Sequence, residues 1–157
     1  NELIKIEIQY DIFTNSINLN GVNVSSFLRS ENVTQNVSKV SSIKSVRDFL
    51  ITIQRRLAEN NNIILDGRDI GTTVFPNAEY KFYIDANIEV RAKRRFEELN
   101  GKYNYQDILD MMIERDSYDQ SRECSPLKKA EDAISIDTTD LSLGEQVNKI
   151  INIINKE

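Results

Sequence analysis

The stretch NNIILDGRDIGTTVF, residues 61–75, joins a short apolar run to a turn crowded with charge and glycine. The apolar run at 63–65 is typical of a buried β-strand. Residues 66–71 then contain two acids, one arginine and two glycines. Because ligands of parallel α/β sheets bind beyond the carboxyl ends of the strands, the pattern predicts a ligand-binding turn. A tight surface turn with a local Arg–Asp pair is the alternative that this stretch leaves open.

The composition limits the classes of protein to consider. The chain has 157 residues, of which 39% are hydrophobic and 29% charged, and this is ordinary for one globular domain. A net charge of −5 disfavours general binding to nucleic acid. With no histidine, mechanisms of the Ser-His-Asp and Cys-His types are excluded, and a conventional zinc site has almost no ligands. The single cysteine, Cys124, excludes an intrachain disulfide.

The sequence shows neither a membrane segment nor a targeting segment. It contains no apolar run of membrane length, and its first residues lack the layout of a signal peptide. We therefore expect a cytoplasmic protein that has no membrane partner.

Hydrophobic periodicity predicts where the helices and strands lie. A strand over 3–9 and a hairpin around Asn20-Gly21 predict a small antiparallel sheet, which short helices over 25–30 and 34–40 follow. From residue 63 on, strands and helices alternate, so a parallel α/β layer structure is expected, with the hairpin region as an insert. The later predicted elements are strands at 62–66, 79–85 and 133–137, and helices at 46–57, 87–99, 107–118 and 142–155, the second of them with Asn87 as its cap.

A second candidate site is the run RDSYDQSR, residues 115–122. On a helix, Arg115, Asp119 and Arg122 would share one face, because their spacings are four and three. Two arginines with a carboxylate between them suit an anionic, hydroxylated ligand such as a nucleotide. The spacing alone favours the alternative, a solvated helix face with local ion pairs.

Two further polar sets are ordinary when each is taken alone. Arg91, Arg94 and Arg95 lie on one predicted helix beside acids at 97 and 98, which favours a surface ion-pair network. The other set is Ser38 with Arg47; Arg47 lies beside the apolar stripe of the helix predicted at 46–57, on the same face as Gln54.

Taken together and in order, these motifs resemble those of bacterial cytidylate kinase. GRDIGT at 67–72, RDSYDQSR at 115–122 and SPLKKAEDA at 125–133 follow one another with family-like spacing. The similarity covers roughly residues 28–155. It implies an α/β fold with the three-layer parallel-sheet core of a nucleoside monophosphate kinase of the P-loop type. It also implies a small antiparallel monophosphate-binding insert over 1–42, the rest of the kinase core over 43–157, and a helical lid at about 100–125.

The resemblance further implies an enzyme of pyrimidine nucleotide metabolism, a monomer when complete. Such an enzyme transfers the γ-phosphoryl group of ATP to CMP or dCMP with Mg²⁺. Positions that match the family's acceptor site bind the cytosine, the phosphate or the ribose. Those implied for the cytosine are Ser38, Arg47 and Asp69; those for the phosphate are Arg68 and Arg122; those near the ribose are Arg115 and Asp119.

Other matched positions concern ATP, the metal and catalysis. Arg91 and Arg95 resemble arginines that face the phosphates of ATP across the lid, and Asp66 is implied to lie near Mg²⁺, in its outer shell. Phosphoryl transfer needs in-line positioning and neutralisation of negative charge more than covalent help. Arginines can supply both, and the residues expected to act in catalysis are Arg68, Arg115 and Arg122.

The sequence departs from the family at the phosphate loop. The only Gly-Lys pair, at 101–102, has Phe96 where the first loop glycine would stand and Tyr103 in place of Ser or Thr. Members of the family carry this loop near the N-terminus, ahead of the insert. We therefore expect these residues to represent part of such an enzyme and to be inactive alone. A non-catalytic CMP-binding module or regulatory fragment is the alternative.

Overall fold

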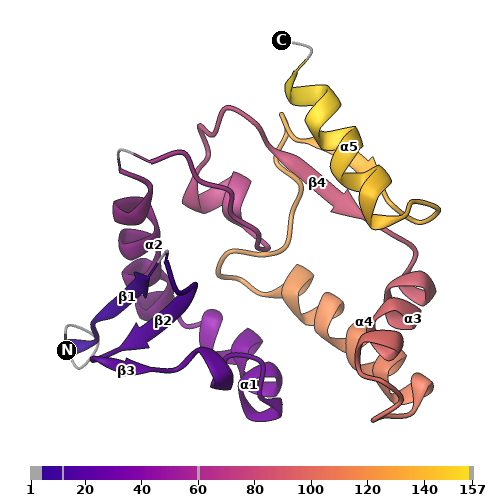
Figure 1. Ribbon diagram of the computed structural model, residues 1–157, viewed down its shortest axis with the longest axis horizontal. Helices are drawn as coiled ribbons and strands as arrows, with labels where there is room; N and C mark the ends of the chain where they lie inside the picture. The colour runs from indigo at the N-terminus through magenta and orange to yellow at the C-terminus, as the bar shows by residue number, and fades with distance from the viewer. Residues whose placement is uncertain (1–4, 12, 60, 156–157) are drawn as a thin grey trace. The chain divides into compact units, whose positions relative to one another are not determined.

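The computed structural model describes residues 5–11, 13–59 and 61–155, and Figure 1 shows the course of the chain. The chain divides into two compact units. One comprises Asn1–Asp66 with Arg122–Ser125, and the other comprises Gly67–Ser121 with Pro126–Glu157. No helix within the described ranges is both long enough and apolar enough to cross a membrane.

The first unit opens with the predicted antiparallel sheet. Strands β1 (Ile8–Asp11), β2 (Ser16–Leu19) and β3 (Val22–Asn23) pair in that order. Asn20 and Gly21 both have positive φ, 51° and 78°, as a two-residue hairpin turn requires, so the predicted hairpin is confirmed. The strand expected at 3–9 is partly wrong, because pairing begins only at Ile8, opposite the last residue of β2. Residues 3 and 4 lie outside the described residues.

Three helical segments follow in this unit, namely η2 (Ser25–Phe27), α1 (Glu31–Ser41) and α2 (Lys44–Ala58). α1 begins three residues before the predicted helix because Ser30 caps it, its hydroxyl accepting from the amide of Val33 at 3.5 Å. These two α-helices carry the predicted candidates Ser38 and Arg47.

The strand predicted over 62–66 is wrong. This segment has no regular secondary structure, and Ile63, Ile64 and Leu65 are 41%, 101% and 39% exposed. A strand is held by hydrogen bonds to a neighbouring strand, and no strand among the described residues pairs with this segment. Its apolar character is therefore not matched by burial.

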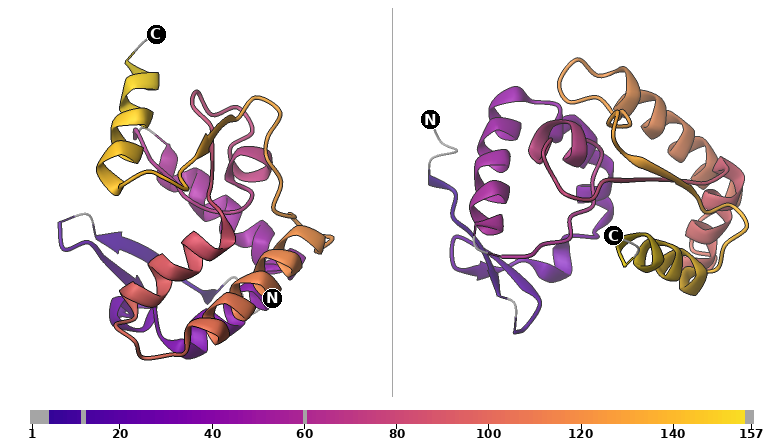
Figure 2. Two further views of the ribbon diagram at one scale, coloured as in Figure 1. Left: turned by 90° about the vertical axis from the view of Figure 1, so that its right-hand side faces the viewer. Right: turned by 90° about the horizontal axis from the view of Figure 1, so that it is seen from above.

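The second unit contains the parallel pair of strands. It comprises the wide helical turn η3 (Ile70–Val74), β4 (Phe82–Asp85), α3 (Ile88–Glu98), α4 (Tyr105–Ser121), β5 (Ile134–Asp137) and α5 (Leu143–Ile154). β4 and β5 pair in parallel from Phe82 with Ile134 to Asp85 with Asp137, which confirms an α/β fold with a parallel sheet. The small core includes Ile136 of β5, Ala92 of α3 and Ile108 of α4. Figure 2 shows α3 and α4 side by side.

Local sequence signals account for two of these helix starts. The Asn87 side chain accepts from the amide of Glu89 at 2.8 Å and caps α3, as predicted. Ser142 and Glu145 form a reciprocal capping box at the start of α5. Asn87 follows the end of β4 by two residues and Ser142 follows the end of β5 by five, so the caps fix where the helices after the two parallel strands begin.

Candidate functional site

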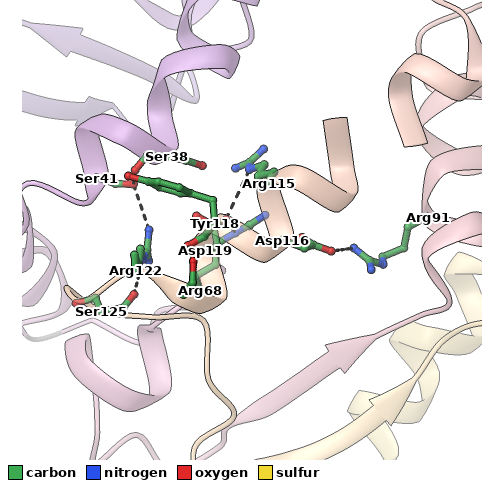
Figure 3. A network of polar contacts seen from close by, with 11 residues as sticks. Ser38, Ser41, Arg68, Arg91, Arg115, Asp116, Tyr118, Asp119, Arg122 and Ser125 are labelled. Atoms are coloured by element: carbon green, nitrogen blue, oxygen red, sulfur yellow. Dashed lines mark hydrogen bonds and ion pairs between the residues drawn. The ribbon is translucent and has the colours of Figure 1, made fainter. Parts of the chain in front are cut away.

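The carboxylate of Asp119 joins two of the predicted arginines. Asp119 lies on α4 and is 1% exposed. Its Oδ2 accepts a hydrogen bond from Nε of Arg68 at 2.8 Å and lies 3.7 Å from Nε of Arg115, one turn earlier on the helix (Figure 3). Arg68 comes from the glycine turn, so the second and first predicted motifs meet at this buried acid.

This cluster carries an excess of positive charge. Arg68 and Arg115 share one carboxylate, while the neighbouring acid, Asp116, pairs with Arg91. Burial, and then the nearby guanidinium of Arg68, lower the pKa of Arg115, and Asp119 opposes the shift only in part. Among the described residues, the buried Nε of Arg115 has no hydrogen-bond partner. A buried charged donor beside a second arginine is suited to an anion such as phosphate.

Asp69, expected to contact a base, is 4% exposed at the start of η3. Its backbone carbonyl accepts from the amides of Thr73 at 2.8 Å and Val74 at 3.2 Å, and from the hydroxyl of Thr72 at 3.3 Å. Three donors on one carbonyl fix the backbone of Asp69. The Cα atom that carries the carboxylate is therefore fixed by the turn.

Arg122 is the first residue after α4 and belongs to the first unit. Its Nε donates to the carbonyl of Ser125 at 2.7 Å, and its Nη1 lies 3.5 Å from Oγ of Ser41 (Figure 3). Ser41 is three residues after Ser38 on α1, so the two serines share a helix face. The shared face was expected only if the whole run were helical; α4 ends at Ser121, so Arg122 lies one residue beyond the helix that carries Arg115 and Asp119.

The predicted ATP and lid arginines, Arg91 and Arg95, lie on α3, and each forms an ion pair with an acid. Arg91 donates to Asp116 of α4 at 2.6 Å and to the carbonyl of Ala86 at 2.9 Å. Arg95 binds Glu98 at 2.7 Å. These contacts agree with the ion-pair alternative for this helix, and the pairing with Asp116 could not be deduced from local spacing.

The sequence did not single out Arg94 as the most constrained arginine of α3. Its Nη2 donates to the carbonyls of Thr138 at 2.6 Å and Leu141 at 3.2 Å, so it holds the loop between β5 and α5. Its position among three close arginines was the only sequence signal, and that signal did not separate it from its neighbours.

Asp66, the predicted outer-shell metal residue, is exposed in the irregular segment before the turn. Within the described ranges, no three side chains of the types that ligate metals come together. Among these residues, Asp66 therefore stands apart from any group of three such side chains.

Comparison with known proteins agrees with the motifs. Residues 1–156 match the family described as cytidylate kinase. A cytidylate kinase of Fusobacterium nucleatum is 46% identical over 156 residues, which cover 98% of this chain and 70% of that protein. Proteins of the same name from Lactobacillus gasseri and Protochlamydia amoebophila are 44% and 49% identical, over 97% and 82% of this chain and 67% and 59% of theirs.

The parallel α/β unit, the two arginines on the buried carboxylate of Asp119, and these relatives together indicate a phosphotransferase. The chain belongs to the cytidylate kinase family.

Proposed function

We propose that this chain binds the acceptor nucleotide of a kinase that transfers the γ-phosphoryl group of ATP to CMP or dCMP. A phosphate oxygen of CMP attacks the γ-phosphorus, and the bond to the bridging oxygen of ADP breaks. The observation that supports this proposal best is the pair of arginines, Arg68 and Arg115, on the single buried carboxylate of Asp119. Asp119 anchors Arg68 through a hydrogen bond, and the two arginines carry one more charge than the carboxylate neutralises.

The residues of the cluster and Asp69 have the following tasks in the proposal. Arg68 binds the acceptor phosphate. Arg115, which the resemblance implies to lie near the ribose, adds its charge to that of Arg68 to neutralise the negative charge that spreads over the transferring group, where prepositioned donors are most effective. Asp119 holds both guanidiniums in place, and its own contact with the ribose rests on the family resemblance. Asp69 accepts a hydrogen bond from the amino group of cytosine, a donor that uracil lacks.

The tasks of the remaining candidates rest on the resemblance alone. Ser38 and Arg47 contact the cytosine, and Arg122 contacts the phosphate. Arg91 and Arg95 face ATP once they have left the carboxylates that they now bind. The three-layer core, the insert over 1–42, the lid at about 100–125 and a monomeric state belong to the same proposal.

Mg²⁺ enters this proposal as part of the substrate, bound to ATP. It would supply charge neutralisation on the β- and γ-phosphates. Asp66 is the carboxylate assigned to its outer shell. No step depends on a metal that the described residues would have to hold by themselves.

We further propose that the 157 residues alone do not transfer phosphoryl groups, because they contain no GxxxxGK[ST] run. That loop supplies the backbone amides and lysine that surround the phosphates of the donor. The second candidate function, a non-catalytic CMP-binding module, is favoured by the same observation. Measurement of phosphoryl transfer separates the two candidates.

Titration calorimetry of CMP into the 157-residue chain tests the acceptor site. We expect binding that Arg115→Ala weakens by about tenfold or more, as the loss of a hydrogen bond to a charged group does. Arg56→Ala is the matched control, because Arg56 is an exposed arginine of α2 outside the proposed site. Equal affinity of the Arg115→Ala and unmodified chains would overturn the proposed role of the cluster.

A further inference from the structure

Lys81 has a nearly buried side chain, 7% exposed, just before β4. Its ammonium donates to the backbone carbonyl of Pro76 and lies 2.5 Å from the carboxylate of Asp132, 51 residues away in the sequence. A lysine is rarely buried unless its charge is paired, and both partners here belong to loops. The ammonium therefore connects the loop that contains Pro76 with the loop that contains Asp132, next to the start of β4.

The stem of Lys81 lies directly against the glycine turn. A Cβ placed on Gly71 would lie 3.2 Å from Cδ of Lys81 and 3.6 Å from Cβ of Ala130. A side chain at position 71 would press on the stem of Lys81. Because Gly71 has none, the backbone of the turn can lie close to that stem. Gly71 is two residues after Asp69, inside the turn whose amides bond back to the carbonyl of Asp69.

We propose that Lys81 is a positioning residue for Asp69: the Asp132–Lys81 ion pair holds the lysine stem as a platform on which the Gly71 turn rests. This inference depends on the proposed function, because Asp69 must contact the base for its position to affect specificity. In this proposal Lys81 does not contact the nucleotide. It sets the nucleotide preference through the turn and leaves the binding of phosphate to the arginines.

Hydrogen exchange in the 157-residue chain tests the mechanical part. In Lys81→Met, which keeps an unbranched stem without the charge, the amides of Thr73 and Val74 should exchange faster by about tenfold, the effect of losing one hydrogen bond to a charged group. Asp132→Asn, which keeps Lys81 and removes the charge of its partner, should act in the same direction. The matched control is Lys128→Met, because Lys128 is an exposed lysine of the same unit.

The affinities for CMP and UMP test the functional part. In Lys81→Met the affinity for CMP should fall while that for UMP stays nearly constant, so the ratio of the two affinities decreases. Lys81→Arg, which keeps the positive charge, should restore part of this ratio. A merely structural lysine would weaken both affinities equally, and that result, or unchanged exchange at Thr73 and Val74, would overturn the inference. If Lys81→Met does not fold, the Asp132→Asn variant decides by the same two measurements.

Asp69→Asn, measured in parallel, separates this inference from the proposed function. If Asp69→Asn narrows the CMP/UMP ratio and neither Lys81→Met nor Asp132→Asn does, only the role of Lys81 is overturned. If Asp69→Asn leaves the ratio unchanged, Asp69 does not contact the base, and both the base-reading role and the inference built on it are overturned.

Discussion

Nε of Arg68 donates to Oδ2 of Asp119 at 2.8 Å, across 51 residues of sequence. The acid is 1% exposed, whereas the arginine side chain is 38% exposed. The pair therefore combines the buried carboxylate of Asp119 with a guanidinium, that of Arg68, which solvent or a ligand can still reach. Such an arginine is ordered before a ligand arrives, which reduces the entropy lost on binding.

The first prediction concerns the stability that Asp119 provides. Asp119→Ala should lower the free energy of unfolding by about 1–3 kcal/mol, because it leaves Arg68 and Arg115 without their shared buried partner. Urea unfolding measures the change, with Glu114→Gln, an exposed acid of the same helix, as the control. Equal losses in the two variants would show that Asp119 does not hold the arginines.

The second prediction concerns Arg122 and needs a protein that turns over. We define the extended protein as these 157 residues preceded by a segment that carries a GxxxxGK[ST] phosphate loop, as the family resemblance implies. In it, Arg122→Ala should lower kcat by orders of magnitude, as loss of a phosphate-clamping arginine does. Loss of its contacts with Ser41 and Ser125 alone should lower the free energy of unfolding by about 1–3 kcal/mol and leave kcat unchanged. A less stable but equally active variant would contradict the catalytic role.

The third prediction concerns base selection by Asp69. The extended protein should prefer CMP to UMP by a wide margin in kcat/KM, because a charged carboxylate repels the oxygen that uracil carries in place of the amino group. Asp69→Asn can donate as well as accept, so it should narrow that margin. An unchanged ratio of kcat/KM values would exclude Asp69 as the group that distinguishes the bases.

The fourth prediction is a dependence of stability on pH. The hydrogen bond from Lys81 lowers the pKa of Asp132 below its ordinary value of 3.8. Because the folded-state pKa is the lower one, the stabilisation is fully present above pH 3.8 and is lost as the pH falls through the folded-state pKa. Melting temperatures between pH 6 and about pH 2.5 should therefore fall less steeply for Asp132→Asn than for the unmodified chain. If the melting temperatures of the two proteins fall equally with pH, the Lys81–Asp132 pair does not contribute to stability.

Local signals in the sequence predicted those parts of the fold that short-range bonds determine. Asn20-Gly21 predicted a hairpin because both residues accept positive φ, and Asn87 predicted a helix start because its side chain bonds to a nearby amide. Residues 62–66 have the composition of a strand, but a strand also needs a partner, and pairing depends on residues far away in the sequence. Composition could not show that no described strand would pair with them.

The same distinction holds for the site. Helical spacing was enough to bring Arg115 towards Asp119, one turn apart. No local pattern connects Arg68 with Asp119, or Lys81 with Asp132, because each pair is separated by 51 residues. The family resemblance implied that Arg68 and Asp119 contact the same ligand, but it implied no role for Lys81.

The most direct test of the account is phosphoryl transfer from labelled ATP to CMP, measured for the 157-residue chain and for the extended protein, with the mass of each confirmed. We expect no CDP from the 157-residue chain and CDP from the extended protein, and the Arg115→Ala variant of the extended protein should lose most of the rate. CDP formation by the 157-residue chain alone would contradict the proposed need for the phosphate loop. An extended protein that folds, binds ATP and still makes no CDP would contradict the proposal that these residues form the acceptor site of a CMP kinase.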